Sequence, residues 1–317
     1  MSRNMSPSPP KEMARRVNPG AGLLDPRGTR KYWTSLYSVL NPNDYLHTAG
    51  NLPDSLLAPV CHPDAPGFLN RFVHSLQQEA LLWALRHLPF PIKAARVLDI
   101  GCGTGRWARL FTALGAQVVG VDLAPEAIHA ARALVPQGQF YCSDLLEMQF
   151  PGQRFDLAIS VTVLQHLPYD EQDKAVARIR HYLRDRGYLI LLENVRDRGF
   201  HVFARPFDEW VRLAEDNGFK IEAVRGYEFV PLLQLEGSVR SAVFALLRPR
   251  GPSRECFQPK DWTDVSISVL KNLYRQTVLR AMVAASAPCE AIARTVLPRR
   301  LATHGVFVFR LNLGTNK

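Results

Sequence analysis

From Arg96 onward, short apolar segments alternate with longer amphipathic ones along the chain. The apolar segments are bounded by Gly and Asp, and they cover residues 96–100, 117–121, 139–142, 155–160, 187–192, 220–225 and 306–311. Strands that alternate with helices are typical of βαβ units, and continuous apolar runs suit strands buried on both faces. The pattern therefore predicts an α/β fold with a doubly wound, mostly parallel sheet of seven strands.

Two further regions show helical patterns outside this core, which we place at residues 91–225 with its last strand in 305–317. Residues 32–90 contain apolar side chains at helical spacing from Tyr32 to Leu40, followed by a second helical stretch over about 67–88. Residues 226–304 separate the last two predicted strands and contain a long helical segment at 263–285. We therefore expect an N-terminal helical cap and a helical insertion that serves as a substrate lobe.

The net charge of +10 is concentrated near the beginning of the chain. Residues 1–31 carry seven basic and two acidic side chains, so half of the excess lies in this segment. The segment has few apolar residues, and we expect it to be a disordered, solubilising tail. An RNA-binding arm is the less favoured interpretation.

The five cysteines lie far apart, without a C-x-x-C pair or a histidine cluster at metal-ligand spacing. We therefore expect free thiols, no metal, and a reducing compartment. The first thirty residues lack an apolar core of signal-peptide length, and no apolar run approaches a membrane span. These features predict a cytoplasmic protein.

The first predicted strand ends in a glycine-rich turn. The acidic Asp99 is followed by Gly101, Gly103 and Gly105, where the chain passes into the next helix. Glycine permits positive φ and lets a ligand approach the backbone. The run lacks the third glycine of G-x-G-x-x-G, which favours S-adenosylmethionine (SAM) over a dinucleotide.

The next two strands each end near an acidic residue. Asp122 lies about twenty residues after the turn, where a carboxylate can accept both ribose hydroxyls, and Asp144 can accept from an adenine amino group. Carboxyl ends of parallel strands share one edge of a sheet, so we expect Asp99, Asp122 and Asp144 to form a line along it. Taken singly, these acids could equally be loop residues or helix caps.

Together these segments resemble the successive motifs of the class I, Rossmann-like SAM-dependent methyltransferases. The likeness covers roughly residues 82–225 and the last strand. It implies that the glycine loop faces the methionine part of SAM, that Asp122 holds the ribose, and that residues 160–162 and 165–166 flank the methyl donor or the acceptor. The implied cofactor-binding residues are Asp99, Gly101, Cys102, Gly103, Gly105, Asp122, Leu123, Ser143, Asp144, Leu145, Ser160 and Val161.

Three histidines are candidate catalytic bases. His166 follows the fourth strand, His201 follows the fifth, and His304 precedes the last strand, whose start reaches the same edge if that strand is antiparallel. Histidine suits proton removal from an oxygen nucleophile because its pKa lies near neutrality. Packing, loop capping or a surface position is the alternative for each, and Glu193 can simply close the end of its strand.

The favoured function is methyl transfer to a small or medium-sized metabolite at oxygen, on a sugar, polyketide or lipid-linked acceptor. The segment 160–163 lacks the Asn/Asp-Pro-Pro-Tyr/Phe box of the family's adenine and glutamine amide N-methyltransferases. An RNA methyltransferase and a non-catalytic binding protein are the alternatives.

Peripheral membrane contact is a hypothesis for the basic amphipathic segment 263–285, with packing on the sheet as its alternative. No feature of the sequence indicates an oligomeric state.

Overall fold

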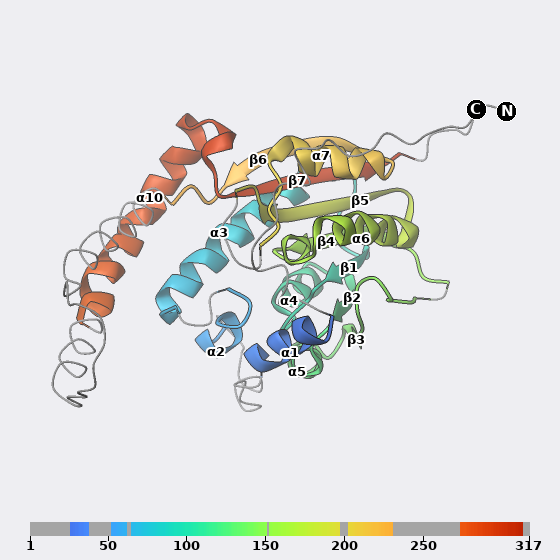
Figure 1. The fold of residues 1–317 in the computed structure, drawn as a ribbon, viewed down its shortest axis with the longest axis horizontal. Helices are drawn as coiled ribbons and strands as arrows, with labels where there is room; N and C mark the ends of the chain where they lie inside the picture. Colours follow the sequence, from blue (N-terminus) through green and yellow to red (C-terminus); the bar gives the residue numbers. More distant parts are fainter. Residues whose placement is uncertain are drawn as a thin grey trace, which may run out of the picture.

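The computed structural model describes residues 26–37, 52–61, 65–150, 152–196, 202–230 and 273–312. Within these ranges the chain forms a seven-stranded sheet of order β3-β2-β1-β4-β5-β7-β6, with helices on both faces (Figure 1). The strands are β1 (Arg96–Ile100), β2 (Gln117–Asp122), β3 (Gln139–Cys142), β4 (Phe155–Val161), β5 (Leu183–Asn194), β6 (Phe219–Tyr227) and β7 (His304–Leu311).

All seven predicted strands are present, and the predicted doubly wound sheet is confirmed. Strands β1 to β5 pair in parallel, whereas β7 lies antiparallel between β5 and β6. The largest difference in bounds is at β5, which begins at Leu183 rather than at Gly187. The carboxyl ends of the parallel strands and the start of β7 therefore share one edge of the sheet.

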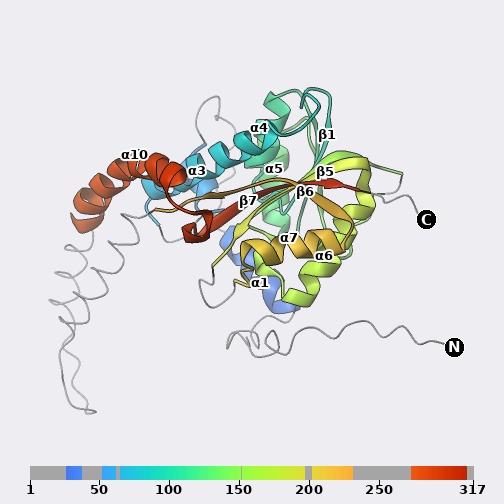
Figure 2. The ribbon, with the colours of Figure 1, turned by 90° about the horizontal axis from the view of Figure 1, so that it is seen from above.

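The sheet separates two apolar layers. One face packs against α3 (Gly67–Leu85), α4 (Arg106–Ala113) and α5 (Pro125–Leu134). The other packs against α6 (Tyr169–Tyr182) and α7 (Phe207–Asp216), and Figure 2 shows these two groups of helices on opposite sides of the sheet. The central strands are buried on both faces, which explains their continuous apolar sequences.

Local chemistry explains where several helices begin. Helix α4 follows Gly105, whose φ of +82° is a left-handed conformation that favours glycine. Helix α5 has Pro125 at its first position, where a missing N–H costs no hydrogen bond. Helix α6 has acidic residues in its first turn and basic ones in its last, which complements the helix dipole.

The N-terminal cap consists of α1 (Pro26–Tyr37), α2 (Asp54–Leu57) and α3. Helix α1 begins six residues before the expected boundary at residue 32, so residues 26–31, which we expected to be part of a disordered tail, are helical. Helix α3 ends at Leu85, slightly before the predicted end at residue 88. The remainder of the expected tail, residues 1–25, lies outside the described residues.

The insertion is helical where the structure describes it. A π-helical turn, η5 (Arg275–Leu279), leads into α10 (Arg280–Val296), which extends past the predicted end at residue 285. Helix α10 lies beside α3 in Figure 1, and Val283 is buried against Phe72 and Leu76. Packing against α3 therefore explains the buried apolar side chain in this part of the insertion. Residues 263–272 lie outside the described residues. No helix in the described ranges is long and apolar enough to cross a membrane.

Candidate cofactor and acceptor site

The glycine turn after β1 is tightly enclosed. Gly101 has φ of +62°, and a Cβ there would lie 2.4 Å from Val163 Cγ2. Gly103 has φ of +53°, and a Cβ there would lie 2.7 Å from Val60 Cγ1. Backbone conformation and space therefore both require glycine at these two positions.

The cap helices cover this turn from the carboxyl edge. Tyr37 of α1 is buried with Ala124 and Ala127, and Trp33 and Val60 pack against the same cluster. The Thr104 hydroxyl donates to the Leu56 carbonyl at 3.3 Å. The N-terminal cap and the glycine turn thus form one enclosed region. This enclosure keeps water away from the glycine turn.

Asp122 links the end of β2 to the glycine turn. Its Oδ2 accepts a hydrogen bond from the Gly103 N–H at 2.9 Å, and its Oδ1 accepts from the Ala124 N–H at 3.0 Å. Burial raises the pKa of Asp122 above its ordinary value, and these backbone donors oppose that rise.

Asp99 lies one strand away and is more deeply buried. The residue is 1% exposed, and its Oδ2 has no hydrogen-bond partner within the described ranges. Burial raises the pKa of Asp99 to about 8, and the neighbouring Asp122 adds to this rise. The two acids therefore interact across adjacent strands, as predicted for residues that share one edge.

The remaining predicted cofactor residues lie at the ends of β1 to β4. Asp144 Oδ1 accepts from the Leu146 N–H at 2.8 Å, and the Ser143 hydroxyl donates to the Asp144 carbonyl at 3.1 Å. Leu123 presents its carbonyl to the Cys142 thiol at 3.6 Å. Leu145 is partly buried, and Cys102 and Val161 are buried.

Ser160, at the end of β4, contacts the protein interior. Its hydroxyl donates to Glu193 Oε1 at 2.8 Å. Glu193 also accepts from the backbone N–H groups of Val163, Leu164 and Gln165, and burial raises the pKa of Glu193 to about 7. Glu193 therefore does more than close its strand, because it fixes the loop that follows β4.

The three predicted histidines have different surroundings. His166 ends the turn η4 (Leu164–His166), and its ring centroid lies 5.0 Å from that of Trp33 in α1. His304 begins β7 opposite Asn194, and its Nδ1 lies 3.0 Å from Glu228 Oε2. His201 lies outside the described residues.

Sequence reasoning missed Arg106, the first residue of α4. Its guanidinium donates to the Val60 carbonyl at 3.3 Å and to His74 Nδ1 and Cys61 Sγ, each at 3.4 Å. Arg106 also lies over the Trp107 ring, 4.5 Å from its centroid. The residue is 4% exposed, and its position directly after Gly105 is the only sequence signal that could have drawn attention to it.

The groups around Arg106 carry little negative charge at neutral pH. Burial lowers the pKa of His74 to about 4, so its imidazole is neutral. Burial likewise raises the pKa of the Cys61 thiol, and the pKa of about 8 keeps Asp99 mostly protonated. Within the described part of the chain, a buried cation thus lies beside the glycine turn without an ionised partner at hydrogen-bond distance.

A doubly wound sheet with an antiparallel β7, a glycine turn after β1 and an acid at the end of β2 defines a Rossmann-like methyltransferase domain. Residues 97–187 match the family model described as "Methyltransferase domain". This part of the chain therefore contains a methyltransferase domain.

Curated relatives share a part of the chain. A ubiquinone biosynthesis O-methyltransferase of Bradyrhizobium sp. is 40% identical over 80 residues, which cover 24% of this chain and 31% of that protein. The O-methyltransferase cnsE of Penicillium expansum is 28% identical over 151 residues, which cover 41% of this chain and 54% of that protein. The chain thus spans between about a third and a half of the length of these relatives.

Among solved structures, the magnesium protoporphyrin IX methyltransferase of Synechocystis PCC 6803 with bound SAM has a TM-score of 0.44 and 19% identity. The match covers 63% of this chain and 89% of that one.

Proposed function

We propose that this protein transfers the methyl group of SAM to an oxygen atom of a small or medium-sized acceptor. The observation that carries the proposal is the enclosed glycine turn, with Asp99 and Asp122 beside it at the edge of the sheet. The family match and the O-methyltransferase relatives support the same reaction type.

The residues present fit the cofactor. Gly101 and Gly103 have positive φ and no Cβ, so a ligand would reach the backbone of the turn once Val60, Tyr37 and Val163 move aside. Asp122 supplies carboxylate oxygens for ribose hydroxyls, and the buried guanidinium of Arg106 suits a carboxylate such as that of the methionine part. Asp144, Leu145, Ser143 and Leu123 would flank the adenine side. When bound, SAM supplies an electrophilic methyl group on a sulfonium.

The protein's contribution to such a displacement is alignment and exclusion of water. Tyr37 and Val60 cover the glycine turn, and Glu193 fixes the loop that carries His166. A histidine near the acceptor would take the hydroxyl proton. For the acceptor itself we propose a sugar, polyketide or lipid-linked hydroxyl compound, and the similarity to O-methyltransferases supports oxygen as the atom methylated.

Calorimetry with SAM and S-adenosylhomocysteine tests the proposal. The wild type should bind both ligands, and Asp122→Ala should lose on the order of 1–3 kcal/mol of SAM affinity, because two ribose hydroxyls lose their acceptor. The exposed Asp170→Ala is the matched control and should bind like the wild type. Thermal unfolding of Asp122→Ala separates lost binding from lost folding, since Gly103 also loses a partner. Failure of the folded wild type to bind either ligand would contradict the proposed function.

A further inference from the structure

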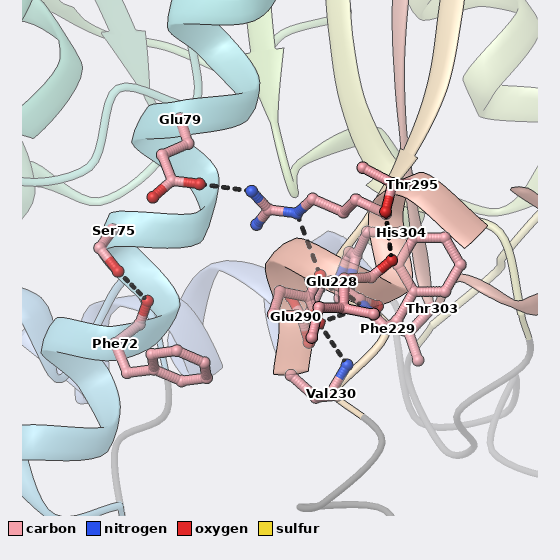
Figure 3. Close-up of polar contacts among 12 residues, drawn as sticks. Phe72, Ser75, Glu79, Glu228, Phe229, Val230, Glu290, Thr295, Thr303 and His304 are labelled. Atoms are coloured by element: carbon pink, nitrogen blue, oxygen red, sulfur yellow. Dashed lines mark hydrogen bonds and ion pairs between the residues drawn. The ribbon is translucent and has the colours of Figure 1, made fainter. Parts of the chain in front are cut away.

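A buried carboxylate and a buried imidazole meet where β6 ends and β7 begins. Glu228 Oε2 lies 3.0 Å from His304 Nδ1, and the two side chains are 5% and 9% exposed. Figure 3 shows both residues beside Thr303, at the end of the sheet next to α10. This pair brings a carboxylate and an imidazole, two groups that can exchange protons, together away from the glycine turn.

The hydrogen bonds around the pair determine which ring nitrogen of His304 carries a proton. The Thr303 hydroxyl donates to the Glu228 carbonyl at 2.6 Å, and its oxygen lies 3.1 Å from His304 Nδ1. Since that proton is already used, the hydroxyl oxygen acts as an acceptor toward Nδ1, and the Glu228 carboxylate lies 3.0 Å from the same nitrogen. The Thr303 hydroxyl therefore requires a proton on Nδ1, and the negative charge of Glu228 favours one there, which leaves Nε2 of a neutral ring as an acceptor.

The backbone at this point has an unusual conformation. Glu228 has φ of +58° and Val230 has φ of +39°, in a region that residues other than glycine seldom adopt. Such conformations persist only where surrounding contacts hold them, and they cluster at functional sites. The Thr303 N–H and hydroxyl both donate to the Glu228 carbonyl, which fixes this residue on the side of β7.

Glu290 of α10 fixes the same segment from the other side. Its carboxylate accepts from the Phe229 N–H at 2.8 Å and from the Val230 N–H at 2.7 Å. Glu290 is 1% exposed and pairs with Arg294, which reaches Glu79 of α3 (Figure 3). The insertion helix thus holds the strained segment that presents the Glu228 side chain to His304.

The pair lies on the edge that also carries the glycine turn. His304 is opposite Asn194, the last residue of β5, and β7 is two strands away from β4. Neighbouring strands are about 4.8 Å apart, so roughly 10 Å separates these two strand ends. Glu228 also adds to the burial-driven rise in the pKa of Cys61, whose thiol receives a hydrogen bond from Arg106.

We propose that His304 is the catalytic base for the acceptor hydroxyl and that Glu228 is its positioning residue. The inference rests on the proposed methyl transfer. Nε2 of His304 takes the proton of the acceptor O–H as the oxygen forms its bond to the methyl carbon, and the carbon–sulfur bond breaks with its electron pair on sulfur. The imidazolium keeps its Nδ1–H on the Glu228 carboxylate and then releases the Nε2 proton to water.

Activity measurements test both roles, with catechol as the hydroxyl probe and S-adenosylhomocysteine formation as the readout. His304→Asn should lower kcat about 100-fold or more without changing the Kd for SAM, and added imidazole should restore part of the rate. Glu228→Gln should lower kcat about tenfold and leave the Kd for SAM unchanged, because the carboxylate stabilises the imidazolium that forms as the proton is transferred. Glu228→Asp should recover part of that loss.

Two variants on the same scaffold serve as controls. His181→Asn removes an exposed imidazole at the opposite edge of the sheet, and Glu222→Gln removes an ion-paired carboxylate elsewhere on β6. Both should retain the wild-type kcat. A folded His304→Asn protein with kcat within threefold of the wild type would overturn the proposal.

A second measurement needs no turnover. Diethyl pyrocarbonate should modify His304 at Nε2 in the folded protein, as mass spectrometry of its peptides can show, and catechol with S-adenosylhomocysteine should slow that reaction. A His304 that stays unmodified in the native protein, yet reacts after denaturation, cannot meet an acceptor and would refute its role as the base. If the wild type does not bind SAM, the proposed function fails independently of this outcome.

Discussion

The two halves of the sheet's carboxyl edge are built in different ways. Around β1 and β2, Asp99, the glycine turn and Asp122 lie within a short stretch of sequence, and a hydrogen bond from the Gly103 N–H to Asp122 joins the turn to the end of β2. Around β7 and β6, the contacts bring together distant residues, since Glu228 and Thr303 are 75 positions apart and Phe229 and Glu290 are 61 apart. The first half can be found as a motif, whereas the second exists only after the chain has folded.

The largest effect should come from the second half. Glu290→Ala leaves two buried N–H groups without their acceptor and leaves the Arg294 guanidinium with only the exposed Glu79, so we expect a loss of about 3–5 kcal/mol in the free energy of unfolding. Urea denaturation measures this loss. Glu79→Ala removes the 60% exposed partner of the same arginine and should cost less than about 1 kcal/mol. Equal losses in the two variants would show that Glu290 does not anchor the segment.

The next effect concerns Asp99 and depends on pH. Burial holds the pKa of Asp99 at about 8, far above the value of an unfolded chain, so the folded protein binds this proton more tightly. The stability that this provides is present below about pH 4 and is lost as pH rises to about 8. Asp99→Asn cannot ionise and should therefore gain a few kcal/mol relative to the wild type across that range.

Urea denaturation at several pH values measures the difference between Asp99→Asn and the wild type. Asp170→Asn, in an exposed ion pair, should show no such trend and serves as the control. A constant difference between pH 4 and pH 8 would mean that Asp99 is not held in its neutral form.

A smaller effect should distinguish the residues that bind the methionine end of SAM from those that bind its adenosine end. Arg106→Gln should weaken SAM binding by about 1–3 kcal/mol, because the variant replaces a charge-assisted partner of the carboxylate. Binding of 5′-methylthioadenosine, which lacks that carboxylate, should change by less than about threefold. Calorimetry with both ligands measures the contrast, and Arg109→Gln, in the same helix, is the matched control. Equal losses for both ligands would assign Arg106 a purely structural role.

The sequence predicted most of the fold and one part of the candidate site. Periodicity located the strands because each is a local segment with its own apolar pattern, and the glycine turn was visible because backbone geometry restricts those positions to glycine. Arg106, Glu228 and Glu290 carry no such local restriction. Their importance comes from burial and from partners on other elements, which a pattern along one chain does not reveal.

His304 shows the same limit in a residue that the sequence proposes as a candidate base. Topology placed it on the correct edge, since an antiparallel last strand must begin there. Its carboxylate partner could not be predicted, because Glu228 adopts a positive φ that depends on Thr303 and α10. The sequence therefore identified His304 as a candidate but did not predict the residues that surround it.

The position of β7 also has a consequence for biosynthesis. Strand β6 has β7 as its sheet neighbour, and residues 228–303 separate the two in the chain. During translation, β6 leaves the ribosome long before the strand that pairs with it. Its backbone donors therefore stay unpaired, and the apolar face of α7 stays uncovered, until residues 304–311 have been synthesised. Strand edges exposed in this way are sites of misassembly, and a nascent chain stalled within the insertion would be a natural client for chaperones.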